Sequence, residues 1–295
     1  MVLWRNIKNQ IYTIAGKENY KMTTILADVL SYPFLQRAFI VGALVALCCA
    51  LLGVSLVLKG FSMIGDGLSH VSFGALTVAM ALNVAPLPFA IPVVIFAAFC
   101  LLKMKNNGTI KGDSGIALIS SSALAIGLMA ASLTTGLNAD VYSYMFGSIL
   151  SMKKTDVMIS IVLSIIVLLL FLFCYHKIFA ITFDESFAKA TGLPVSGFNM
   201  LIAFLSAVTI VLGMRMMGAM LISSLILFPC LIARQLFHNF LGVTICSGII
   251  SLVSFTIGMV ISYQFDAPVS ASIVLVNLAF LLLFKLISKI TTKSR

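Results

Sequence analysis

Long runs without any Asp, Glu, Lys or Arg restrict what this sequence can fold into. These runs cover residues 38–58, 71–102, 114–139, 157–176, 190–214, 216–233, 235–265 and 267–284. A helix that crosses a bilayer needs about 20 predominantly apolar residues, so each run can supply at least one span. Charged residues make up only 9% of the chain, whereas a typical soluble domain has about 25%. We therefore predict a membrane protein without a separate water-soluble domain.

The continuous apolarity of the runs predicts helices and argues against a β-barrel, whose strands alternate over about 10 residues. Nine helices are predicted, at 39–58, 65–82, 87–102, 114–134, 157–176, 196–213, 218–234, 242–262 and 269–286. We expect an all-α, polytopic transmembrane bundle of about eight to ten spans. It divides into an amphipathic entry segment over 1–38, a transmembrane domain over 39–288 and a basic tail over 289–295.

The excess of basic residues, 19 Lys and Arg against 9 Asp and Glu, is interpreted as a topology signal. Cytoplasmic loops of membrane proteins collect Lys and Arg, so binding of nucleic acid is not expected. One set of alternate connections contains Lys59, Lys103, Lys105, Lys111, Lys177, Lys189, Arg234, Lys285, Lys289, Lys293 and Arg295. The opposite set contains only Lys153, Lys154 and Arg215, so the first set is predicted to be cytoplasmic. The side on which the N-terminal segment lies is left open.

A carboxylate and an imidazole interrupt the second predicted helix. Asp66 and His70 lie four residues apart, which brings both side chains to one helix face. Ionisable residues inside a span are costly and mark functional sites. Oxygen and nitrogen donors together suit a first-row divalent ion such as Mn²⁺ or Zn²⁺. The alternative is a helix-end pair, in which Asp66 caps the helix N-terminus and His70 binds a carbonyl group.

A short amphipathic segment over 182–194 lies on the predicted cytoplasmic side. Asp184 and Glu185 favour a helix start and Gly192 favours its end, while Phe187 and Ala188 offer a small apolar face. Such a segment is either an ordinary interfacial loop or a helix that binds a partner protein.

Small residues and one proline predict how the helices pack. Gly74 and Gly218 favour close helix contacts, and Pro229 predicts a kink inside its helix. All six cysteines lie in apolar runs without CxxC spacing, so they are interpreted as small buried side chains.

Three charged residues near helix ends have open roles. Arg215 is interpreted as an interfacial anchor, with a gate residue as the alternative. Asp140 and Asp266 flank the outer ends of helices, either in solvated loops or as contacts for a docking protein. The sequence has no GxxxxGK[ST] pattern, so any ATP-driven step must be powered by another polypeptide.

Six segments carry motifs of one known family. They are 32–38 (YPFLQRA), similar to its entry segment; 65–70 (GDGLSH), similar to GDxLSHA; 146–150 (FGSIL), similar to FGSIL; 183–192, similar to the DEEFAKALG coupling helix; 218–229 (GAMLISSLILFP), similar to GALLVSALLILP; and 261–268 (ISYQFDAP), similar to its last outer loop. The chain departs from the family at 71–74, where ALPG becomes VSFG. Together these motifs resemble the membrane subunits of bacterial ABC importers for zinc, manganese and iron(II).

The resemblance implies a type II ABC importer-like fold and a homodimeric, multi-pass permease in the bacterial cytoplasmic (plasma) membrane. It implies that Asp66 and His70 contact the transported divalent metal, zinc or manganese and possibly iron(II). The coupling-helix residues that it implies dock onto the ATPase are Phe183, Asp184, Glu185, Phe187, Ala188 and Gly192. The expected partners are two ATPase copies, an extracellular or periplasmic metal-binding protein, a second copy of the chain and membrane lipid.

The chain itself is expected to be a transport subunit rather than an enzyme, with no permanently bound cofactor. The alternative is a secondary transporter driven by an ion gradient, with Asp66 as the coupling carboxylate. Such transporters often contain inverted repeats, which the sequence does not display, and the match to the coupling helix argues against this alternative.

Overall fold

The fold is known from a computed structural model that describes residues 33–107, 112–134, 147 and 154–293. All regular secondary structure in these residues is helical, without strands. The helices are α2 (Pro33–Leu58), α3 (Ser62–Ala81), α4 (Pro86–Asn107), α5 (Gly112–Leu133), α7 (Lys154–Phe173), α8 (Tyr175–Phe183), α9 (Glu185–Ala190), α10 (Val195–Met217), α11 (Ala219–Leu236), α12 (Phe240–Phe265) and α13 (Val269–Lys293). Contacts divide the chain into two units, residues 1–40 and 41–295. The packing described below lies within the second unit.

Eight helices in the described part of the chain are long and apolar enough to cross a membrane. They are α2, α4, α5, α7, α10, α11, α12 and α13. This number lies within the predicted range of eight to ten spans, and the prediction of a multi-pass, all-α membrane protein is confirmed. Each of the nine predicted helices is present, with ends shifted by a few residues. The one outside the apolar set is α3, which contains Asp66 and His70.

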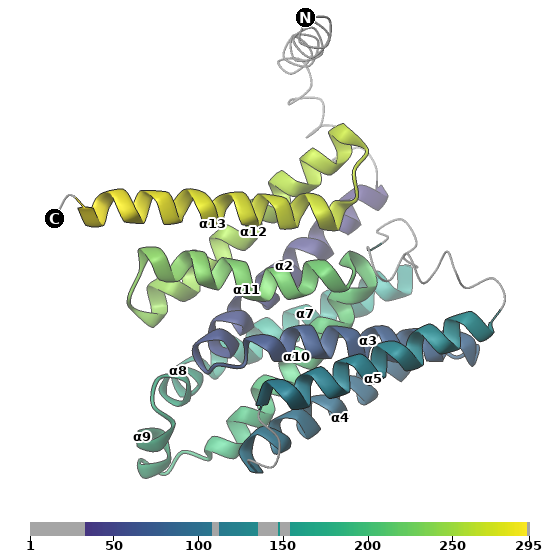
Figure 1. Ribbon diagram of the computed structural model, residues 1–295, viewed down its shortest axis with the longest axis horizontal. Coiled ribbons are helices and arrows are strands. Elements are labelled where there is room, and N and C mark those ends of the chain that lie inside the picture. The colour runs from purple at the N-terminus through teal and green to yellow at the C-terminus, as the bar shows by residue number, and fades with distance from the viewer. Residues whose placement is uncertain (1–32, 108–111, 135–146, 148–153, 294–295) are drawn as a thin grey trace, which may run out of the picture. The chain divides into compact units, whose positions relative to one another are not determined.

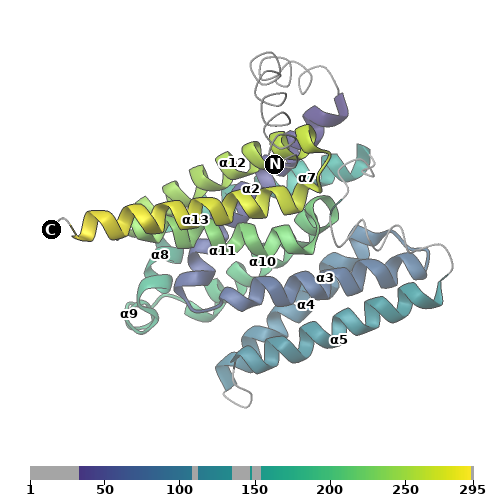
Figure 2. The ribbon, with the colours of Figure 1, turned by 45° about the horizontal axis from the view of Figure 1, so that its top comes forward.

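α3 packs against four other helices, α4, α5, α10 and α11. Figures 1 and 2 both show α3, α4 and α5 side by side. Residues 71–77 of α3 are all buried. The close approach of α3 to α5 depends on Gly74, because an added Cβ atom there would collide with the carbonyl oxygen of Ala123. A small residue at such a contact lets two helix backbones come together.

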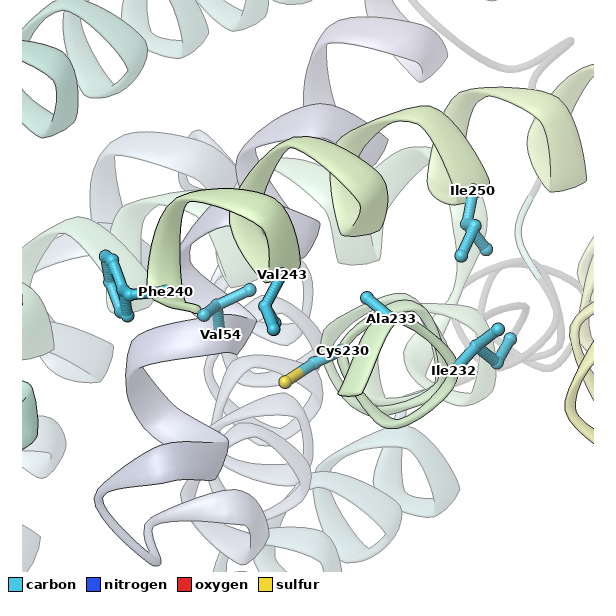
Figure 3. Packing of buried hydrophobic residues seen from close by; sticks show 7 residues of the cluster. All are labelled: Val54, Cys230, Ile232, Ala233, Phe240, Val243 and Ile250. Carbon is cyan, nitrogen blue, oxygen red and sulfur yellow. The ribbon is translucent and has the colours of Figure 1, made fainter. Parts of the chain in front are cut away.

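A second group of helices, α11, α12 and α13, packs together with the last turns of α2. Figure 3 shows the buried cluster between them: Val54, Cys230, Ile232, Ala233, Phe240, Val243 and Ile250. Lipid tails are as apolar as these side chains, so helix association rests on van der Waals packing and hydrogen bonds between helices. Ser251 supplies one such bond, its hydroxyl donating to the carbonyl of Ala46 in α2 at 2.9 Å.

The helix ends explain where the chain turns. α4 begins at Pro86, one residue before the predicted start, and Pro229 lies inside α11, as predicted. Gly218 lies outside both neighbouring helices: it separates α10 from α11 with φ of 80°, a conformation that glycine adopts without strain. α13 continues to Lys293, so the basic segment expected as a tail over 289–295 begins inside this helix.

Candidate functional site

A cavity beside α3 brings Asp66 and His70 together with residues of α5. Its volume is about 240 Å³, and its lining residues are Met63, Asp66, His70, Ile116, Ala117, Ser120, Ser121 and Leu124. The Asp66 side chain is 44% exposed and that of His70 is 32% exposed, so the cavity opens to the surface of the single chain. Hence both predicted donors are accessible to an ion.

Close packing of α3 on α5 positions the two donors over the serines of α5. A Cβ atom added to Gly67 would lie 2.6 Å from Cγ2 of Ile116 and 3.2 Å from the hydroxyl of Ser120. Glycine at 67, between the two donors, therefore sets the width of the cavity. The helical spacing of Met63, Asp66 and His70 places all three on the same side of α3.

Asp66 is held from a second helix. Its Oδ1 accepts a hydrogen bond from the hydroxyl of Ser223 in α11 at 3.0 Å. Its Oδ2 lies 3.7 Å from Nε2 of His70, too long for a direct hydrogen bond. One carboxylate oxygen is thus anchored, and the other faces the imidazole across a gap.

The helix-end alternative for this pair is not supported. Phe61 is the N-cap residue of α3, and Asp66 is the fifth residue of the helix. The backbone N–H groups near Asp66 are therefore already inside the helical ladder, and its side chain is used by Ser223 and the cavity. Among the described residues, no group of three or more His, Cys, Asp or Glu is placed to hold an ion.

The predicted short helix over 183–192 is α9, and its ends form as expected. Asp184 is the N-cap residue, and its Oδ1 accepts a hydrogen bond from the backbone N–H of Phe187 at 2.9 Å. Gly192 ends the helix with φ of 82°. The N–H groups of Gly192 and Leu193 donate to the carbonyls of Lys189 and Ala188, which is the Schellman pattern of a helix C-terminus.

The two faces of α9 differ from the prediction in one respect. Phe187 of α9 and Phe183, the last residue of α8, are exposed, at 64% and 84%, and give the start of α9 apolar surface. Ala188 was expected on this surface but is fully buried, packed with Ile181 and Val195. The reason is the helical turn, because a residue next to exposed Phe187 points about 100° away from it.

Arg215 is paired rather than anchored at an interface. Its Nη2 lies 2.7 Å from Oδ2 of Asp156, and the two side chains are only 13% and 11% exposed. The expectation of a snorkelling side chain is therefore wrong, because the guanidinium group is buried against the carboxylate at the start of α7. Asp156 received no role from the sequence, although a carboxylate that opens an apolar run is a visible signal.

The remaining predicted residues are placed as follows. Asp266 is exposed and ends α12 with φ of 49°. Asp140 lies outside the described residues, as does most of the segment 146–150. Gly147, which is described, has φ of 80° and approaches the backbone of Met216 and Met217.

Sequence reasoning missed the partner of Asp66. Ser223 lay within a recognised helix motif but had no assigned role. Ser120 and Ser121 also line the cavity, and the sequence analysis assigned neither of them a role. The available signal was polar residues clustered in otherwise apolar helices, at 120–122 and 223–224.

Comparison with known proteins identifies the family. Residues 31–288 match the model of the ABC 3 transport family. The chain belongs to this family. Its members include relatives of known description. One is the manganese transport system membrane protein MntC of Halalkalibacterium halodurans, 28% identical over 86% of this chain and 87% of the relative. Another is the "Probable iron transport system membrane protein" of Haemophilus influenzae, 32% identical over 90% and 97%.

A solved structure has the same fold. The structure titled "PsaBC from Streptococcus pneumoniae in complex with Fab" superimposes with a TM-score of 0.80 at 28% identity, covering 89% of this chain and 95% of that chain. The family and the fold are therefore established over nearly the whole described chain, including α3, α9 and α11.

Proposed function

We propose that this chain is the membrane permease subunit of an ABC importer for a divalent first-row transition ion, with Mn²⁺, Fe²⁺ and Zn²⁺ as the candidates. The observation that carries the proposal is the pair Asp66 and His70 facing one open cavity on α3. Family membership supports it, as do the manganese and iron transport named for the two relatives.

The geometry of the pair suits two ligands of one ion. Donors bound at about 2.1 Å and at a tetrahedral angle lie about 3.4 Å apart. Asp66 Oδ2 and His70 Nε2 are separated by 3.7 Å, so a small side-chain rotation brings both within bonding distance. Ser223 keeps the other carboxylate oxygen occupied, which favours binding through one oxygen.

Transport needs weak binding, and a single chain offers an incomplete ligand set. Two donors are half of a four-coordinate shell, and a second copy of the chain facing the cavity would add two more. An ion held in this way could still exchange ligands with water and leave, which conduction along a path requires.

Energy is supplied by a partner in this proposal. The chain carries no P-loop pattern, and Phe183 at the end of α8 and Phe187 in α9 form a docking surface for an ATPase subunit. A metal-binding protein delivers the ion on the opposite side, Asp66 and His70 bind it in passing, and ATP-driven movement of α9 alternates access to them.

The test is uptake of radioactive manganese, iron and zinc by cells that carry Asp66→Asn or His70→Ala as the only copy of the chain. Asparagine keeps the shape of Asp66 and its bond from Ser223 but removes the charge. We expect both variants to lose uptake while their amount in the membrane stays near wild type. His70→Cys then distinguishes the metals, because a thiolate binds Zn²⁺ well and Mn²⁺ poorly.

The matched control is Ser69→Ala. Ser69 belongs to the same motif, but its hydroxyl donates to the backbone carbonyl of Asp66 and the residue is buried away from the cavity. This variant should retain uptake. Normal uptake by both Asp66→Asn and His70→Ala would show that the ion does not pass these side chains.

A further inference from the structure

A polar cluster of three side chains joins the start of α9 to the start of α3. Glu185, the first residue of α9, has its Oε2 3.5 Å from Nζ of Lys59. Lys59 also donates a hydrogen bond to Oδ1 of Asn199 in α10. The amide nitrogen of Asn199 in turn donates to Oε1 of Glu185 at 3.0 Å. The connection between α2 and α3 therefore meets two consecutive helices from much later in the chain, α9 and α10, at one carboxylate.

The lysine of this cluster is buried, and the glutamate is not. The Lys59 side chain is 5% exposed, whereas that of Glu185 is 52% exposed. The ammonium group lies 6.0 Å from the centre of the Phe61 ring. Leu56, Ile64, Leu102 and Ile202 surround it. A buried charge is strongly destabilising when its partner is removed. If Glu185 moves, separation of the ion pair is therefore costly, which favours movement of Lys59 together with the Glu185 carboxylate.

The position of Lys59 connects this cluster to the candidate metal site. Lys59 lies between α2 and α3, followed by Gly60 with φ of 69° and by Phe61, the N-cap residue of α3. Asp66 is in the second turn of the same helix. A displacement of Lys59 therefore acts on the first turn of the helix that carries both donors.

We propose that Lys59 and Glu185 are a positioning pair that transmits movement of α9 to α3. The proposal rests on the proposed function, in which α9 binds the ATPase. Phe187 of α9 binds the partner together with Phe183 at the end of α8. Glu185, on the same short helix as Phe187, moves with α9 and displaces Lys59 in the connection before α3. Asn199 holds the carboxylate in place and includes the start of α10 in the movement.

The experiment compares transport with ATP hydrolysis in the same vesicles. The permease is purified with its ATPase, reconstituted into liposomes, and assayed for metal ions taken up per ATP hydrolysed. Lys59→Gln removes the buried charge, keeps an N–H donor for Asn199 and changes no residue of the predicted docking set. We expect the variant to bind the ATPase and hydrolyse ATP, with ions per ATP reduced at least about fivefold, the lower end of typical coupling between sites.

Two further variants separate transmission from stability. The charge-swapped double variant Lys59→Glu with Glu185→Lys should regain most of the lost ratio, because it restores an opposite pair. Lys189→Gln is the matched control: it removes an exposed charge from the same helix, outside the cluster, and should keep the wild-type ratio.

The results that overturn the proposal are distinct from a failure of the proposed function. An unchanged ratio in Lys59→Gln, or loss of ATPase binding by that variant, would show that Lys59 and Glu185 do not act as a transmitting pair. The proposed function fails independently, if wild-type vesicles take up no metal or if the wild-type chain does not bind the ATPase.

Discussion

At the scale of single residues, the ion pair between Arg215 and Asp156 joins the last turn of α10 to the first turn of α7. Taking two charges out of water is expensive, and their attraction offsets this cost only while both are present. The pair therefore contributes little net stability against an apolar replacement, but the loss of one partner leaves the other charge unpaired in a buried place.

We predict that Asp156→Asn lowers the stability of the chain by about 3 kcal/mol, the low end of the range for a broken buried pair, because the side chains keep some exposure. Thermal melting in detergent micelles measures the effect. The double variant Asp156→Leu with Arg215→Met should melt well above Asp156→Asn. If Asp156→Asn has the same melting temperature as the wild type, the ion pair has no role in stability.

At the scale of elements, α9 is a helix of six residues that is stable only because its surroundings hold it. The side chain of Asp184 caps its start, and Gly192 ends it. The side chain of Ala188, on the inner face of α9, is buried against Ile181 and Val195. These contacts leave Phe187 exposed without using it for folding, so the side chain is available for a partner.

We predict that Phe187→Asp weakens binding of the ATPase subunit by about 2 kcal/mol or more, close to 30-fold, because an aromatic anchor of an interface is lost. Co-purification at several salt concentrations measures the binding. Phe265→Asp is the control: Phe265 is 60% exposed and ends α12. Equal binding by both variants would show that the docking surface does not include Phe187.

At the scale of the whole molecule, exposed faces differ in chemistry. α5 is the least buried of the eight candidate spans, at 22%. Its exposed residues mix apolar side chains such as Leu118 and Met129 with Ser114, Ser121, Ser122 and Ser132. The exposed residues of α7 are apolar along the helix, including Ile165, Ile166, Leu169 and Leu172. Lipid suits the second surface, whereas small polar residues are typical of helix contacts in membranes.

We predict that the second copy of the chain covers α5, which lines the cavity that contains Asp66 and His70. A cysteine introduced as Ser121→Cys should form crosslinks between copies under mild oxidation in native membranes. Leu169→Cys on α7 should remain uncrosslinked. Electrophoresis without reducing agent measures both against the wild-type chain, which contains its own cysteines. Crosslinking through position 169 and not through 121 would place the interface on α7.

The sequence by itself determined the class and the helices of this protein. In lipid, a continuously apolar run of bilayer length must form a helix, because only a helix pairs all of its backbone N–H and C=O groups within the segment. The nine predicted helices therefore followed from hydropathy. Asp66 and His70 stood out because ionisable groups are rare in such runs. Asp184 and Gly192 bounded α9 because cap residues act on neighbouring backbone groups, and this information is local.

Only the tertiary structure decided which residues meet across the chain. Ser223 reaches Asp66 over 157 positions, and Lys59 reaches Asn199 over 140, so no local pattern could connect them. The same holds for Arg215, which sequence alone assigned to the interface, and for Ala188, which it assigned to the surface of α9. Hydropathy fixes whether a segment enters the membrane, but the direction of each side chain depends on which helix packs beside it.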